Sequence, residues 1–174
     1  MTTTPPTGQS HSPPPNTAWA ERPPLVAAMY NPALIACMLS AAAGAYKRHT
    51  PSGMPLALSF VIVPLALHRG TRDALPATTS THLRKWVERH PVVRTGFPDR
   101  AQALVDSVRQ GLRFALRHHI LELHEDALLS SAELPARAAE YPELDDILRI
   151  SRLLGRWLAK DDTATVFALL GVAP

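Results

Sequence analysis

The densest group of side chains that could bind a metal lies between residues 118 and 124. A zinc site needs three or four donors that converge with fixed geometry. Here a helix is expected to change into a strand, which would point the side chains in different directions. We therefore expect neither a metal site nor a cofactor at these residues, which are His118, His119, Glu122 and His124.

Motifs of the common enzyme classes are absent from the sequence. It has no G-x-x-x-x-G-K-[ST] phosphate loop, no G-x-G-x-x-G and no G-x-S-x-G elbow. His124-Glu125 begins like a zinc protease motif, but Leu128 stands where that motif has its second histidine. We expect a protein that is not an enzyme, with no catalytic residues and no small-molecule substrate.

The binding of anions by arginine and lysine is a second kind of chemistry. The formal net charge is +3, with a basic excess in residues 80–119 and an acidic excess in residues 120–174. Phosphate contacts need little beyond accessible positive charge, whereas sequence readout needs a recognition helix that reaches base edges. Solvated helix faces and ion-paired subunit contacts are the alternatives. The candidates for contact with DNA or an acidic partner are Arg84, Lys85, Arg89, Arg109, Arg113 and Arg117.

Two nearly uncharged segments are expected to form the core. Asn31-Pro32 predicts the start of a helix that reaches about Tyr46, because asparagine caps helices and proline suits the first helical position. The run Gly53 to Leu67 has fifteen residues without a charge, too few for a membrane span of about 20. Its length favours a helix over a buried strand, with Pro55 at the first position and a kink at Pro64. The two segments should pack together or be covered by a partner subunit.

A mixed group of polar residues ends the apolar run. It consists of His68, Arg69, Arg72 and Asp73. The group is too mixed in charge for an active site, and it suits a helix end or the rim of a subunit interface.

The remaining elements predict a mainly α fold. A short helix is expected at about Thr81 to Arg89, and a longer amphipathic helix is expected to open near Pro98-Asp99. A β-hairpin should follow at about residues 120–129, and two further helices at residues 143–160 and 163–170. A short helix, a longer helix and a hairpin follow one another in this order in a winged-helix unit. We therefore expect a compact helical domain with a small β-hairpin, winged-helix-like at about residues 80–130.

Residues 1–24 differ in composition from the rest of the chain. They contain seven prolines among Thr, Ser and Gln, without the basic and apolar regions of a signal peptide. Such a segment buries too little to offset its ordering entropy. We expect a disordered tail at 1–24 and a single domain at 25–174. One cysteine excludes a disulfide framework and fits a reducing compartment, so we expect a cytoplasmic protein without a membrane anchor.

Three blocks of the sequence resemble the middle component of bacterial three-component ABC systems, the small third protein of Lamassu-type anti-phage defence. They are Asn31-Pro32-Ala33, the stretch from Gly53 to Pro76, and Leu154 to Lys160 followed by Thr165 to Val172. Their order and spacing together are fairly specific, and the resemblance covers roughly Tyr30 to Pro174. The motif positions are Asn31, Pro32, Gly53, Pro55, Pro64, His68, Arg72, Leu75, Pro76, Gly155, Trp157 and Phe167.

The resemblance implies a winged-helix-like, non-enzymatic protein that works beside an SMC-like ABC ATPase and a separate effector, often a nuclease. Such a subunit would dock on the ATPase, near its head domains, and help hold the effector inactive until phage or plasmid DNA is sensed. DNA contact within the complex is compatible with this role. The alternative is a stand-alone winged-helix transcriptional regulator, which predicts sequence-selective DNA affinity and usually a symmetric dimer.

Overall fold

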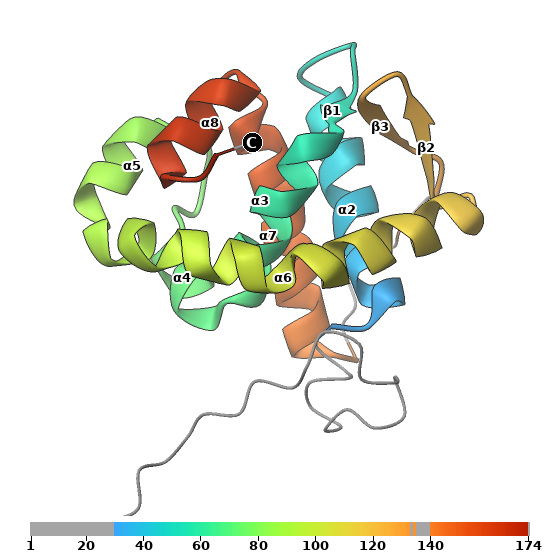
Figure 1. Cartoon of the computed structure of the whole chain (residues 1–174), viewed down its shortest axis with the longest axis horizontal. Coiled ribbons are helices and arrows are strands. Elements are labelled where there is room, and N and C mark those ends of the chain that lie inside the picture. The colour runs from blue at the N-terminus through green and yellow to red at the C-terminus, as the bar shows by residue number, and fades with distance from the viewer. Residues whose placement is uncertain (1–29, 133, 135–139, 174) are drawn as a thin grey trace, which may run out of the picture.

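Helices dominate the structure, and a small antiparallel sheet lies at one end of the molecule (Figure 1). The computed structural model describes residues 30–132, 134 and 140–173, so the tail predicted at residues 1–24 lies outside the described residues. The predicted fold class, mainly α with a β-hairpin, is confirmed. In chain order the elements are α2 (Pro32–Lys47), β1 (Met54–Pro55), the 3₁₀ helix η2 (Leu56–Leu58), α3 (Ser59–Leu67), α4 (Arg69–Ala74), α5 (Leu83–Arg89), α6 (Pro91–Arg117), β2 (Leu121–His124), β3 (Ala127–Ser130), α7 (Pro142–Leu158) and α8 (Thr163–Leu170).

Helix α2 lies at the centre of the core, as its lack of charge predicts. The Asn31 side chain accepts a hydrogen bond from the backbone N–H of Ala33 at 2.8 Å, and Pro32 occupies the first turn. Helices α3, α6 and α7 pack against α2, and most of its residues are buried. The alanines and Gly155 let α2 and α7 cross closely, because a Cβ built on Gly155 would lie 2.2 Å from the carbonyl oxygen of Ala42. The crossing of α2 and α7 therefore depends on a residue without a side chain.

The apolar run begins as a strand, which corrects one prediction. Pro55 does not open a helix but pairs as part of β1 with Ala127, and the α-helix starts only at Ser59, after η2. Proline is tolerated there because β1 is an edge strand, where a missing N–H breaks no ladder. The helix with an internal proline is confirmed in α3, which contains Pro64 and is buried on almost every side.

The predicted β-hairpin is confirmed as β2 and β3, and β1 adds a third strand that the sequence pattern did not indicate. The strand order is β1-β3-β2, all antiparallel. Gly53 precedes β1 with φ of +82°, a conformation that favours glycine. The Ser40 hydroxyl on α2 hydrogen-bonds the Ser130 hydroxyl on β3 at 2.8 Å, which fixes the sheet to the core.

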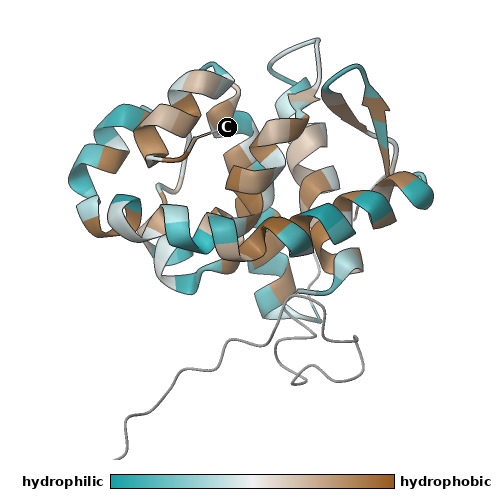
Figure 2. Ribbon diagram, in the orientation of Figure 1, coloured by the Kyte–Doolittle hydropathy of each residue, from teal (hydrophilic) through white to brown (hydrophobic). Residues whose placement is uncertain are grey.

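Helix α6 begins earlier than predicted and crosses the front of the molecule (Figure 1). It opens at Pro91 rather than near Pro98, and Pro98 lies inside it. An internal proline costs a helix one backbone hydrogen bond. Here Arg100 Nη2 donates to the carbonyl of Val93 at 3.1 Å, in the turn that Pro98 loosens, and Phe97 is fully buried. Figure 2 shows the alternation of polar and apolar residues along α6 that the sequence predicted.

Two tryptophans join α5 to α7. Trp86 and Trp157 meet edge to face, with ring centroids 5.4 Å apart. The indole N–H of Trp157 donates to the carbonyl of Thr81 at 2.6 Å, and that of Trp86 donates to the carbonyl of Ala74 at 2.8 Å. Helix α8 spans the predicted residues 163–170, is capped by Asp162 and ends at Gly171 with φ of +73°. Helix α8 also packs against α5 and α6.

Candidate functional site

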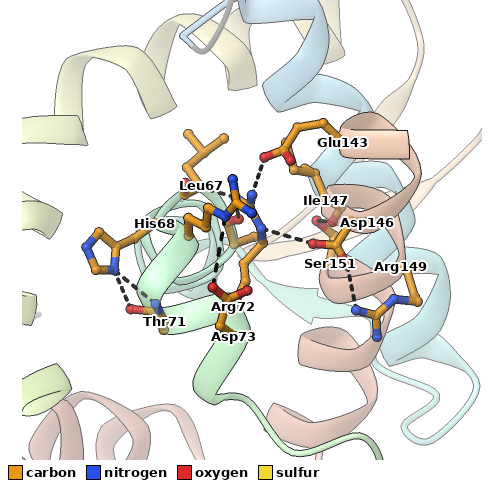
Figure 3. Close-up of polar contacts among 12 residues, drawn as sticks. Leu67, His68, Thr71, Arg72, Asp73, Glu143, Asp146, Ile147, Arg149 and Ser151 are labelled. Carbon is orange, nitrogen blue, oxygen red and sulfur yellow. Dashed lines mark hydrogen bonds and ion pairs between the residues drawn. The ribbon is translucent and has the colours of Figure 1, made fainter. Parts of the chain in front are cut away.

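The mixed polar group after the apolar run contains a buried arginine. Arg72, on α4, has a side chain only 2% exposed. Its Nη1 atom donates to the carbonyls of Ala66 and Leu67 at 2.9 and 3.0 Å (Figure 3). These carbonyls end α3, where a helix leaves its last carbonyls without backbone partners. Arg72 therefore caps the helix formed by the apolar run.

The same guanidinium binds the start of α7. Its Nε donates to Asp146 Oδ2 at 3.2 Å, and its Nη2 pairs with Glu143 (Figure 3). Asp146 also accepts a hydrogen bond from Arg149. A buried cation needs such partners because an unpaired charge is strongly unfavourable inside a protein. Arg72 thus connects α3, α4 and α7, and we call this set of contacts the Arg72 clamp.

The structure confirms that this polar group forms a helix end, but it does not place all four residues on the surface. The group does form a helix end, but Arg72 lies inside the fold, whereas His68, Arg69 and Asp73 are exposed. The rim of a subunit interface stays a prediction for these three residues alone.

His68 caps α4 at its start. Its Nδ1 accepts the backbone N–H of Thr71 at 3.1 Å and lies 2.8 Å from the Thr71 hydroxyl oxygen. Partial burial of the imidazole ring, together with the positive charges of Arg100 and Arg72, lowers the pKa of His68 below its ordinary value. The neutral ring, which can accept at Nδ1, is therefore the form that the fold favours.

This cap should make stability depend on pH. The unfolded chain binds a proton at His68 more readily than the fold does, so the cap contributes above the unfolded pKa of about 6.5. That contribution is lost as the pH falls through the lower, folded pKa. We expect His68→Asn, which caps without titrating, to reduce the loss of stability between pH 7 and pH 5, by less than the ~1 kcal/mol of a full N-cap. Urea unfolding at both pH values measures this.

The exposed residue His49 provides the control. His49→Asn should leave the pH dependence of the wild type unchanged. Equal pH dependence in wild type and His68→Asn would contradict the role of the cap.

The other motif positions also serve the fold. Asn31 and Pro32 start α2, Gly155 permits the α2–α7 crossing, and Trp157 and Phe167 are buried. Leu75 and Pro76 follow α4 and are half-buried. These residues of the three blocks therefore build the scaffold.

The six predicted basic residues are all exposed, but the structure separates them into two groups. Arg84, Lys85 and Arg89 lie on α5, at the left in Figure 1, beside the start of α6. Arg109, Arg113 and Arg117 lie toward the other end of α6, near the hairpin. With a rise of about 1.5 Å per residue, Arg109 lies about 27 Å along α6 from Pro91. The basic residues therefore form two surfaces and not one continuous patch.

The hairpin next to the second basic group is acidic. Glu122, Glu125 and Asp126 are exposed on it, and His124 Nε2 lies 3.3 Å from Glu122 Oε2. Within the described residues, no group of three or more histidine, cysteine, aspartate or glutamate side chains could hold a metal ion. A search of the same part of the chain finds no helix with the length and apolar character needed to cross a membrane.

A groove lies beside the first basic group, between α5, the first turns of α6 and α8. It has a volume of about 540 Å³. The sequence analysis did not identify it, because its walls come from three separate helices. Two of its lining residues had a sequence signal: Arg84 is one of the six predicted contact residues, and Arg94 belongs to the basic excess of residues 80–119. The groove is lined by Arg84, Val87, Glu88, Pro91, Arg94, Thr95, Thr165, Ala168 and Leu169.

A comparison with protein families identifies the chain. Residues 19–174 match the family described as ABC-three component (ABC-3C) system Middle Component 3. The chain belongs to this family. The predicted resemblance to a middle component of three-component ABC systems is therefore confirmed, while its Lamassu-type, SMC-like refinement stays a prediction. No curated protein and no solved structure gives a match.

Membership assigns this middle component to a multi-component ABC defence system, so its partners are the other components of that system. The family match extends farther toward the N-terminus than the resemblance of the three blocks, which began near Tyr30. The basic residues and the groove of this middle component lie on exposed faces of the scaffold that those blocks build.

Proposed function

We propose that this middle component is a non-catalytic adaptor in its ABC-three component system. It docks on the ABC ATPase, which is SMC-like as in Lamassu-type systems, and helps to control a separate effector, such as a nuclease. The family match over residues 19–174 carries this proposal. The roles of the motif residues support it, because caps, close helix crossings and buried aromatic rings maintain a scaffold rather than a reaction centre.

Co-expression with the neighbouring genes tests the proposal. A tagged copy of the chain is expressed together with the products of the adjacent genes and purified at low and at raised salt. We expect the ATPase to co-purify with the chain, and the effector to be retained in the same complex. A chain that purifies alone, without an ATPase neighbour, would contradict the adaptor role.

The second candidate is a stand-alone winged-helix regulator. The predicted order of short helix, longer helix and hairpin is present in α5, α6 and β2–β3. A strand that precedes these helices and pairs with the second hairpin strand, as β1 pairs with β3, is also typical of winged-helix units. The exposed arginines of α6 favour contact with phosphates.

The charge of the hairpin argues against this candidate. In a winged-helix protein the hairpin lies beside the DNA backbone, and here it carries Glu122, Glu125 and Asp126. Carboxylates repel phosphates, so the hairpin would weaken binding. An electrophoretic shift with the upstream promoter, repeated at raised salt, separates the two candidates. We expect no sequence-selective shift, and a selective shift that survives raised salt would favour the regulator.

A further inference from the structure

We propose that the groove between α5, α6 and α8 is a docking surface for an acidic segment of another component of the system. The segment carries carboxylates on both sides of an apolar side chain. This inference rests on the adaptor role proposed above and assigns it a place on the molecule.

The groove is built from helices that the core holds in fixed positions. Val87 is buried at its floor, and Pro91 and Leu169 lie half-exposed or exposed along its walls. Arg94 Nε donates to the carbonyl of Leu169 at 3.2 Å, which joins α6 to α8 across one wall. The Trp86–Trp157 contact holds α5 from behind. The groove is therefore a concave site between packed helices, and its volume of about 540 Å³ has room for a few side chains.

The charge around the groove has the sign needed to bind carboxylates. Arg84 and Arg94 line it, with Glu88 as the opposing charge, and Lys85 and Arg89 stand exposed on the same short helix. Within the described part of the chain, Arg84, Lys85 and Arg89 have no ion pair and no side-chain hydrogen bond. Complementary charge guides association and fixes the register of a partner. These cations are available to a partner because the fold leaves them unpaired.

The apolar part of the groove lining points to a protein as the occupant. Pro91 and Ala168 line the groove and are exposed, and Leu169, also in the lining, is half-exposed. These three residues offer apolar surface that a partner's side chain can cover. The backbone of duplex DNA carries phosphates but no apolar group to cover these residues. An acidic segment with a central apolar residue matches both features.

The experiment uses the co-expressed complex with matched charge reversals. Arg84→Glu/Lys85→Glu alters the groove, and Arg113→Glu/Arg117→Glu changes the charge by the same amount at the far end of α6. All four residues are exposed, so the fold should tolerate both pairs. Ala168→Trp fills the groove without changing its charge. The component that co-purifies with wild type is then titrated against each purified variant, and circular dichroism verifies folding.

We expect the groove pair and Ala168→Trp each to weaken the affinity for that component by about tenfold or more, and the control pair to change it less than about threefold. Equal binding by the groove variants and wild type would overturn the inference and leave the adaptor role standing. A larger loss of affinity in the control pair than in the groove pair would also overturn the inference, because it would place the interface at the far end of α6. A wild-type chain that binds no neighbour would refute the adaptor role itself.

Two other occupants would also overturn the inference. If the groove variants abolish self-association in size-exclusion chromatography but leave partner binding intact, the occupant is a second copy of this chain. The acidic hairpin with Leu123, 43% exposed, is the part of that copy that would fit. If the groove variants lower affinity for a DNA duplex and not for the partner, the occupant is nucleic acid.

Discussion

Arg72→Ala is expected to lower the free energy of unfolding by about 3 kcal/mol. Removing one partner of a buried ion pair costs about 3–5 kcal/mol when the other charge is left buried. Here the carboxylates are partly solvated, with side chains 59% exposed for Glu143 and 36% for Asp146, which places the effect at the lower end. The carbonyls of Ala66 and Leu67 also lose their donor. Urea unfolding followed by circular dichroism measures the change.

Two matched variants test the reason for this loss. Arg69→Ala removes an arginine from the same helix, but its side chain is 82% exposed and its nearest carboxylate, on Asp73, lies 4.0 Å away. Its effect should stay within about 0.5 kcal/mol. Arg72→Lys keeps the charge but cannot donate in a planar fork to carbonyls and carboxylates together, so it should fall between the two. Equal stability of Arg72→Ala and Arg69→Ala would show that the clamp does not support the fold.

Elements that depend on neighbouring residues are predictable from this sequence. Asn31-Pro32 begins α2, Asp162 and Gly171 bound α8, and the hairpin follows α6, because caps and turns act within a few residues. The predictions that were wrong concern segments whose structure depends on contacts with residues outside the local pattern. Pro55 lies in a strand because its partner Ala127 is far along the chain, and α6 starts at Pro91 because a buried Phe97 and the Arg100 hydrogen bond support the proline inside it.

The candidate sites likewise combine features that a local sequence pattern predicts with features that only tertiary packing creates. Exposure of the six basic residues follows from the amphipathic pattern, and the structure bears it out. Their separation into two surfaces depends on the length of α6. The sequence predicted that this helix starts near Pro98, and so it underestimated the length. The partners of Arg72 lie 71 and 74 positions away, so a local pattern cannot reveal that the cation is buried. The groove is assembled from three helices by tertiary packing, for which the sequence carries no local signal.

The use of the motif residues in packing has a consequence for the adaptor role. In this chain the motif residues form caps, a buried arginine contact and a close helix crossing, so they serve the scaffold and not an exposed surface. Arg84, Lys85 and Arg89 are outside the motif blocks and project from a short helix held by Trp86. Substitutions on this exposed surface can therefore change partner binding without disturbing the core.

Gly155→Ala is expected to destabilise the fold by about 3 kcal/mol, the upper part of the range for overpacking. The added Cβ would lie 2.2 Å from the carbonyl oxygen and 3.0 Å from the Cα of Ala42. These atoms belong to the backbone of α2, so no rotamer change can relieve the contact, and α2 and α7 must move apart. The shift would spread, because α2 also packs against α3 and α6. Thermal and urea unfolding measure the loss.

Gly44→Ala provides the matched control, since it makes the same chemical change inside α2. A Cβ on Gly44 would lie 3.6 Å from Ser130 Cβ, which is ordinary van der Waals contact. Because alanine is favoured over glycine in a helix by about 1 kcal/mol, Gly44→Ala should stabilise the protein by up to that amount. The two substitutions should therefore have opposite signs. If Gly155→Ala were also stabilising, helix propensity would outweigh the crossing, and the close approach of α2 and α7 would not be the reason for a glycine at this position.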